Sequence, residues 1–186
     1  MKNNTENNPR IYVGTYGKYS SGSISGKWFD LTDYKNLEDF YKNIKEYHKD
    51  EYDPEFMFQD WENIPKCLIG ESWIHEEIYD YVNELKDDNI CFELFNDFLN
   101  YYYSFDFDSI YQAIEEMHER LRGCYNSLEE YAEQELDLMT DEFEALNNIE
   151  IPDSIKRNLD YKGYKIDLDQ GGFIFTENGY VFDFSY

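Results

Sequence analysis

The chain has 186 residues and a formal net charge of −25, from 41 acidic side chains against 16 lysines and arginines. Nucleic acids and anionic membrane surfaces are bound through basic patches, so this charge excludes both as direct partners. Aromatic residues make up 19% of the chain, whereas disordered acidic segments carry few aromatic residues. The sequence therefore predicts a folded protein whose small cores are built on aromatic rings.

The cysteines and the N-terminal segment indicate neither a cofactor nor an export signal. Cys67, Cys91 and Cys124 are odd in number and lack C-x-x-C spacing, which argues against a disulfide framework and a zinc site. No apolar run approaches the ~20 residues of a membrane span, and no basic-then-apolar signal segment is present. We expect a cytoplasmic protein without a cofactor or a metal ion. Residues 1–8 are expected to form a disordered polar tail.

Residues 9–66 are predicted to form a small α+β domain. A helix is expected from about Asn36 to His48, because apolar side chains recur there with helical spacing. The segment Gly17–Gly22 is predicted to be a Gly/Ser turn. Period-two alternation predicts three strands, over residues 10–16, 23–31 and 55–61.

Residues 67–108 are predicted to form an acidic helical domain. They hold eleven acidic side chains against one base, Lys86, and glycine is absent between Gly70 and Gly123. Apolar side chains with helical spacing predict one helix over residues 74–85 and another over residues 90–102.

Residues 109–186 are predicted to form a second α+β domain. Ser109 can cap one helix, and Ser127 with Glu130 forms a capping box that opens the longest helix, to about Leu146. A short strand is expected over residues 120–126 and a short helix after Pro152. Asn178-Gly179 predicts a hairpin of strands 173–176 and 180–184. The side of the long helix expected to be buried carries Leu128, Ala132, Leu136, Met139, Phe143 and Leu146. The fold class is thus α+β, in three small units.

The acidic side chains gather on helix faces. Residues 67–150 hold 23 acids against three bases, and on the long helix Glu130, Glu133, Asp137, Asp141 and Glu144 are spaced by three or four residues. At about 1.5 Å of rise per residue, this spacing places a carboxylate roughly every 5–6 Å, against one phosphate charge per about 1.7 Å of duplex DNA. Solvation explains a single acidic stripe, but solubility needs far less charge than this segment carries. The natural partner is a protein that binds a polyanion.

Motifs for catalysis or metal binding are incomplete. Gly14–Ser20 lacks the spacing of a phosphate loop, and His75-Glu76 lacks the second histidine of a zinc protease. Asp167–Asn178 lacks the closing glutamate of a calcium loop, and a polar turn into the following strand is preferred there. No catalytic residue and no metal ligand are assigned.

Several segments together resemble the ArdA antirestriction family. They are Pro9–Tyr19, Ser23–Leu31, Asp50–Asp60, Arg122–Ser127 with the helix after it, Asp160–Leu168 and Gly179–Phe182. The resemblance implies an elongated, three-part, acidic dimer that mimics bent B-form DNA. Such a protein occupies the DNA groove of type I restriction-modification enzymes and catalyses no reaction. It also implies that the C-terminal domain, residues 109–186, forms the homodimer.

The acids expected to bind the partner as phosphate mimics lie in the second and third domains. They are Glu76, Glu77, Asp80, Glu84, Glu93, Asp97, Glu115, Glu116, Glu119, Glu129, Glu130, Glu133, Asp137, Asp141 and Glu144. Two other classes stay open: an acidic adaptor or chaperone for a basic nucleic-acid-binding protein, and an enzyme. A large cleft that holds a carboxylate of raised pKa would favour the enzyme.

Overall fold

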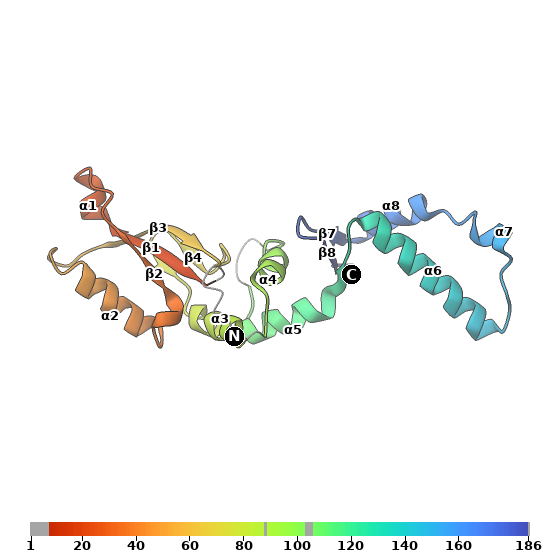
Figure 1. The fold of residues 1–186 in the computed structure, drawn as a ribbon, viewed down its shortest axis with the longest axis horizontal. Helices are drawn as coiled ribbons and strands as arrows, with labels where there is room; N and C mark the ends of the chain where they lie inside the picture. The colour runs from red at the N-terminus through yellow and green to blue at the C-terminus, as the bar shows by residue number, and fades with distance from the viewer. Residues whose placement is uncertain (1–7, 88, 103–105, 186) are drawn as a thin grey trace. The chain divides into compact units, whose positions relative to one another are not determined.

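The computed structural model describes residues 8–87, 89–102 and 106–185 (Figure 1). These residues form eight α-helices, a short 3-10 helix and small antiparallel sheets of three, two and three strands, which confirms the α+β class in separate units. The chain divides into two compact units, residues 1–115 and 116–186. The three-domain division stays a prediction, and the predicted tail lies outside the described residues except for Asn8.

The first unit begins with a three-stranded sheet covered by one helix (Figure 1). The strand order is β2 (Lys27–Asp30), β1 (Arg10–Thr15), β3 (Phe56–Glu62), and the helix is α2 (Leu37–Tyr47). Ile11 of β1 pairs with Phe29 on one side and Trp61 on the other. Phe29 meets Phe40 of α2 edge to face, with ring centroids 6.1 Å apart. The predicted helix and the first and third predicted strands are confirmed, whereas the strand predicted over residues 23–31 forms only over Lys27–Asp30. The core between the sheet and α2 combines Phe29, Phe40 and Phe58 with aliphatic side chains.

A short helix replaces part of the predicted Gly/Ser turn. Helix α1 (Tyr16–Ser20) continues directly from β1. Its start is fixed by the Thr15 hydroxyl, which accepts a hydrogen bond from Lys18 N at 3.2 Å, so a side-chain cap overrides the weak helix propensity of this segment. Only the residues after Ser20 form the turn.

A small hairpin precedes the helices of the acidic segment. It consists of β4 (Ile69–Gly70) and β5 (Trp73–Ile74), followed by α3 (Ile78–Lys86) and α4 (Phe92–Leu99). The prediction that the first helix begins near residue 74 was therefore wrong by about one turn. The Trp73 indole lies so close to Gly70 that a Cβ at this position would overlap Nε1. Phe58 N donates to Glu71 O at 2.8 Å and attaches the hairpin to β3.

The two helices of this segment are confirmed and pack through aromatic side chains. Tyr81 of α3 and Phe95 of α4 are fully buried and stack with ring centroids 5.8 Å apart. The Tyr81 hydroxyl donates to Asn63 O at 2.8 Å, which ties α3 to the end of β3. Lys86 reaches the 3-10 helix η2 (Leu31–Asp33) and donates to Thr32 O at 2.8 Å.

Helix α5 (Ile110–Arg120) contains the boundary between the units. The second unit has the strand order β6 (Leu121–Cys124), β8 (Tyr180–Asp183), β7 (Phe173–Phe175), and the helices α6 (Leu128–Asn147), α7 (Asp153–Lys156) and α8 (Tyr161–Gly171). The predicted strand, capping box, long helix, short helix and hairpin are confirmed. The core of this unit consists of Leu128, Tyr131, Ala132, Leu168 and Val181.

Two expectations for the second unit were wrong. The segment before the hairpin is helix α8 rather than a polar turn; its start is capped by Asp160, whose Oδ1 accepts from Gly163 N at 2.9 Å. On α6, Leu128 and Ala132 are buried as expected, but Met139, Phe143 and Leu146 are 49%, 52% and 86% exposed. The apolar stripe therefore continues beyond the part of the unit that covers it.

Candidate functional site

The first acidic surface follows one side of α3. We call Glu77, Asp80, Glu84 and Asp87 the α3 acidic face; their spacing of three, four and three residues places them on one side of a helix. None of the four is buried. Burial and the neighbouring Glu77 raise the pKa of Asp80, as expected where carboxylates share a site. Glu76 is exposed just before the helix begins.

The charges of all four acids of the α3 acidic face are felt at one residue, Tyr111. This half-exposed residue of α5 has its pKa raised by the charge of Asp80 first, then by burial and by the other three acids of the α3 acidic face. The start of α5 is fixed on α3, because Ile110 N donates to Glu77 Oε2 at 3.2 Å. The α3 acidic face and the first turn of α5 thus form one negative surface within the first unit.

The second acidic surface follows α6. We call Glu129, Glu130, Glu133, Asp137, Asp141 and Glu144 the α6 acidic face. Its span from Glu130 to Glu144 is about 21 Å at 1.5 Å of rise per residue. Glu129 and Glu133 are exposed, and among the described residues their side chains have no hydrogen-bond or ion-pair partner. They are the carboxylates of this surface most available to an external cation.

The other acids of the α6 acidic face have partners within the unit. Glu130 Oε2 accepts from Asn126 N at 2.7 Å as part of the helix cap, and Asp137 Oδ1 accepts from the Tyr161 hydroxyl at 2.8 Å. Lys156 Nζ lies 2.6 Å from Glu144 Oε2 and 3.5 Å from Asp141 Oδ1. This hydrogen bond with Lys156 lowers the pKa of Glu144, whose side chain is only 16% exposed.

The remaining predicted acids also divide into those whose side chains have a partner within the structure and those whose side chains do not. Glu84 accepts from Asn89 Nδ2 at 2.8 Å, Glu93 accepts from the Cys91 thiol at 2.9 Å, and Glu116 pairs with Arg120 at 2.8 Å. Asp97 is half-buried on α4. The exposed members without a hydrogen bond or ion pair of their own side chain in the described structure are Glu76, Glu115, Glu119, Glu129 and Glu133. Sequence spacing identifies the acidic faces but does not separate these two classes.

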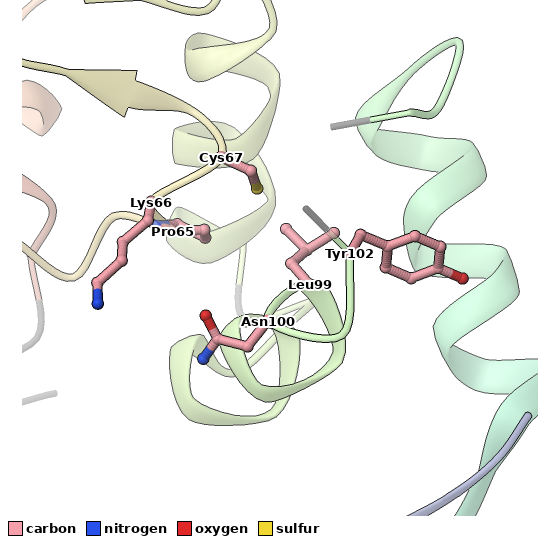
Figure 2. Close-up of a pocket in the computed structure, with 6 residues that line it drawn as sticks. All are labelled: Pro65, Lys66, Cys67, Leu99, Asn100 and Tyr102. Atoms are coloured by element: carbon pink, nitrogen blue, oxygen red, sulfur yellow. The ribbon is translucent and has the colours of Figure 1, made fainter. Parts of the chain in front are cut away.

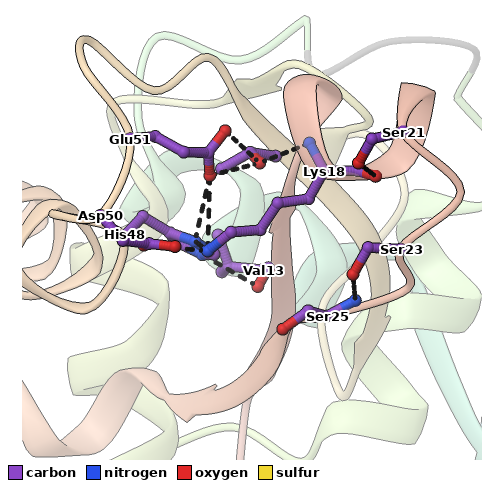
Figure 3. A network of polar contacts seen from close by, with 9 residues as sticks. Val13, Lys18, Ser21, Ser23, Ser25, His48, Asp50 and Glu51 are labelled. Atoms are coloured by element: carbon purple, nitrogen blue, oxygen red, sulfur yellow. Dashed lines mark hydrogen bonds and ion pairs between the residues drawn. The ribbon is translucent and has the colours of Figure 1, made fainter.

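A polar network in the first unit escaped the sequence analysis (Figure 3). Lys18 Nζ lies 3.2 Å from His48 Nδ1, 3.0 Å from Asp50 Oδ1 and 3.4 Å from Glu51 Oε1. The Thr15 hydroxyl also donates to Glu51 at 2.8 Å. The donor atoms of His48, Asp50 and Glu51 are grouped closely enough to hold a metal ion. The lysine ammonium lies among them and supplies the positive charge itself.

The hollow shown in Figure 2 does not have the character of an active site. It has a volume of about 220 Å³ and is lined by Pro65, Lys66, Cys67, Leu99, Asn100 and Tyr102. Burial raises the pKa of the Cys67 thiol to about 11, so the thiol stays protonated at neutral pH and is a poor nucleophile. Among the described residues, no carboxylate lines this hollow.

A second hollow, of about 310 Å³, lies beside the start of α6 and is lined by Glu129, Glu133, Leu159, Asp160, Tyr161 and Lys162. Asp80, whose pKa is raised, lies on the α3 acidic face of the other unit. Among the described residues that line the two hollows, Asp80 is therefore in neither.

The fold and the two acidic surfaces define an acidic α+β protein whose charged side chains face outward. Comparison with known families matches residues 11–182 to the family described as antirestriction protein (ArdA). The chain belongs to the ArdA antirestriction family. A search of curated proteins finds no match. Among the described helices, none combines the length and apolar character needed to cross a membrane.

Proposed function

We propose that this ArdA-family chain is a DNA mimic that occupies the DNA-binding groove of type I restriction-modification enzymes. The observation that carries the proposal is that each unit presents a row of outward-facing carboxylates along a helix, at α3 and at α6. Membership of an antirestriction family supports a restriction enzyme as the target. The groove of such an enzyme must be lined by lysine and arginine side chains that bind phosphates.

The proposed mechanism is competition without chemistry. Carboxylates take the places of phosphates and pair with cationic side chains in the groove, so no bond is made or broken and no cofactor takes part. Such complementarity mainly accelerates association and selects the partner, and salt weakens it. The protein acts in the cytoplasm, where restriction enzymes meet incoming DNA, and it acts as a homodimer.

The structure suggests which acids contribute most. Glu76, Glu115, Glu119, Glu129 and Glu133 are exposed, and their side chains lack partners in the described residues, so their charges are available to the target. Glu130 and Glu144 are held by the fold. We therefore expect the five exposed acids to determine the affinity for the target. Glu130 and Glu144 are expected to maintain the geometry of the α6 acidic face.

The test is displacement of labelled duplex DNA from a purified type I restriction-modification enzyme. Mimicry predicts release near stoichiometry at low salt and loss of release at high salt. If a large excess releases no DNA, the proposal fails. Binding of a basic nucleoid protein as tightly as the restriction enzyme would favour the acidic adaptor instead.

A matched pair of variants separates local geometry from total charge. The triple change Glu119→Gln, Glu129→Gln and Glu133→Gln removes three acids of the second unit, whereas Asp33→Asn, Glu38→Gln and Glu55→Gln removes three exposed acids of the first unit. At about 0.2–1 kcal/mol per exposed charge pair, the first variant should displace DNA about three- to a hundredfold less effectively. The second variant should resemble the wild type. Equal losses would show that net charge alone is recognised.

A further inference from the structure

The second hollow lies between two helices that pack against each other, α6 and α8 (Figure 1). The start of α6 supplies two of its lining residues, and the start of α8 with the two residues before it supplies four: Glu129, Glu133, Leu159, Asp160, Tyr161 and Lys162. Its volume of about 310 Å³ is at the lower end of the ~300–1,000 Å³ that is usual for small-molecule sites. The hollow therefore suits one side chain or one small group rather than a large ligand.

The charge of the lining selects a cation. Glu129 and Glu133 are four residues apart on α6, so they lie on one side of the helix and about 6 Å apart along its axis. Both are exposed, and among the described residues their side chains have no hydrogen-bond or ion-pair partner. Asp160 uses Oδ1 to cap α8, where it accepts from Gly163 N at 2.9 Å. The lining thus sets three carboxylates against one ammonium, that of Lys162.

An aromatic ring held in place lies beside these carboxylates. The Tyr161 hydroxyl donates to Asp137 Oδ1 at 2.8 Å, which links the start of α8 to α6. This hydrogen bond is the main cause of the raised pKa of Tyr161, and the charge of Glu133 contributes to the same shift. Leu159 is half-buried and adds aliphatic surface to the lining. The hollow therefore combines negative charge with an aromatic and an aliphatic side.

We propose that this hollow receives an arginine side chain of the protein that the α6 acidic face binds, an inference that rests on the proposed function and names one of its contacts. A guanidinium is planar, carries five N–H donors in a fixed fork and stacks on aromatic faces. Glu129 and Glu133 can therefore accept from different nitrogens of one guanidinium. The Tyr161 ring contacts its plane, and Leu159 contacts the aliphatic stem.

The lining favours arginine over other cations. A lysine ammonium is a compact and strongly hydrated point charge, so it pairs with the carboxylates but gains less from the ring and from Leu159. A divalent metal ion takes oxygen ligands and likewise makes no use of an aromatic or aliphatic side. Recognition of arginine at this hollow therefore differs from the rest of the α6 acidic face, where only the sum of the charges matters.

Lys162 has the opposite effect on this site. Its exposed side chain lines the same hollow, so its ammonium repels an incoming guanidinium and competes with it for the carboxylates. Replacing this lysine with a neutral residue should therefore tighten the binding of arginine, whereas replacing Glu133 should weaken it.

The experiment is an NMR titration of the full chain with two capped tripeptides, acetyl-Gly-Arg-Gly-amide and acetyl-Gly-Lys-Gly-amide. The arginine peptide should shift the amide signals of the residues that line the hollow. It should also bind about two- to fivefold more tightly than the lysine peptide, which is the gain expected from a cation–π contact at an exposed site.

Matched variants separate the ring from the charge. Tyr161→Leu removes the ring without changing the net charge and should abolish the preference for arginine. Glu133→Gln should weaken binding of the arginine peptide by about two- to fivefold, and Lys162→Gln should strengthen it. The control is Glu142→Gln, which removes an exposed acid of the same helix outside the hollow and should change the affinity little. Unchanged signals of the buried Val181 show that each variant is folded.

The outcomes separate this inference from the proposed function. Equal affinity of the wild type for the two peptides overturns the arginine site, and so does an equal loss of affinity in Glu133→Gln and Glu142→Gln. Either result leaves competition for the groove standing if the wild type still displaces DNA from the restriction enzyme. A preference for arginine without any displacement of DNA overturns the competition and keeps the hollow as a site for an arginine of another protein.

Discussion

Lys18 Nζ lies 3.2 Å from Nδ1 of the fully buried His48 ring. An ammonium can only donate, so Nδ1 must accept and the imidazole must be neutral. The other ring nitrogen, Nε2, faces Val13 O at 3.4 Å, and an imidazole that accepts at Nδ1 carries its proton at Nε2. The pair thus fixes the protonation state of His48 and joins α1 to the C-terminal end of α2.

This arrangement predicts a pH dependence of stability. Burial, and then the charge of Lys18, lower the pKa of His48 from its ordinary 6.5. Above pH 6.5 the ring is neutral in both folded and unfolded chains; below it the unfolded chain takes up a proton more readily than the folded one. The free energy of unfolding should therefore fall as pH decreases below 6.5. Urea unfolding at pH 7.5 and 5.5 should show a larger loss for the wild type than for His48→Gln. Equal losses would mean that His48 is not the group responsible.

The capping box of α6 should contribute measurably to stability. Ser127 Oγ accepts from Glu130 N at 3.1 Å, and replacing such a cap with alanine costs about 1 kcal/mol. Ser127→Ala should lower the free energy of unfolding by about that amount, measured by urea denaturation. Ser20→Ala, at an exposed serine without a capping bond at the end of α1, is the control and should change it little. If Ser127→Ala leaves the free energy of unfolding unchanged, the fold of the second unit, rather than the cap, determines where the helix starts.

Two adjacent glycines are expected to respond oppositely to the same substitution. Gly172 ends α8 with φ of +101°, and a Cβ there would lie 3.1 Å from the Phe184 backbone, whereas a Cβ at Gly171 meets nothing within 4 Å. Gly172→Ala should lower the free energy of unfolding by more than about 1 kcal/mol. Gly171→Ala, at the last residue of the helix, should be neutral or stabilising. Thermal unfolding of both variants checks this, and similar effects would contradict the assigned helix end.

Lys156 should stabilise the second unit. Lys156→Met removes the partner of Glu144, which lies 2.6 Å from the ammonium. The variant should have a lower Tm than Lys42→Met, which removes an exposed lysine of α2. Calorimetry on both variants measures the difference. Equal Tm values would show that the ion pair with Glu144 adds nothing to the stability of the unit.

Much of this fold follows from periodicity and local capping chemistry. The strand β1, the helix α2, the capping box of α6 and the hairpin at Asn178-Gly179 occur where the sequence predicts them. Helix α1 was missed because its first turn depends on the Thr15 side chain, and α8 because Asp160 caps a segment rich in glycine and aspartate. Each strand of the hairpin before α3 has only two residues, and Trp73 packs against Gly70 within it. Strands this short show no periodicity that a sequence analysis could detect.

The candidate site could be predicted as a charge pattern but not as a set of available charges. Spacing placed Glu133 and Glu144 on the same stripe, yet Glu133 lacks a partner in the described residues whereas Glu144 holds Lys156 and the backbone after α6. Those partners lie 7 to 12 residues away along the chain. The same limitation applies to Phe143, because its helical period indicates an apolar side and not what covers that side.

Among the described residues, ion pairs tie the α6 acidic face to the rest of its unit only toward the end of the helix. Lys156 pairs there with Asp141 and Glu144, whereas Glu129 and Glu133 are exposed near the start of α6. Substitutions at Glu129 or Glu133 leave these ion pairs in place, and the effects of such independent sites usually add. A lineage of these proteins can therefore vary the acids that face a new restriction enzyme while the ion pairs that hold the end of α6 are retained.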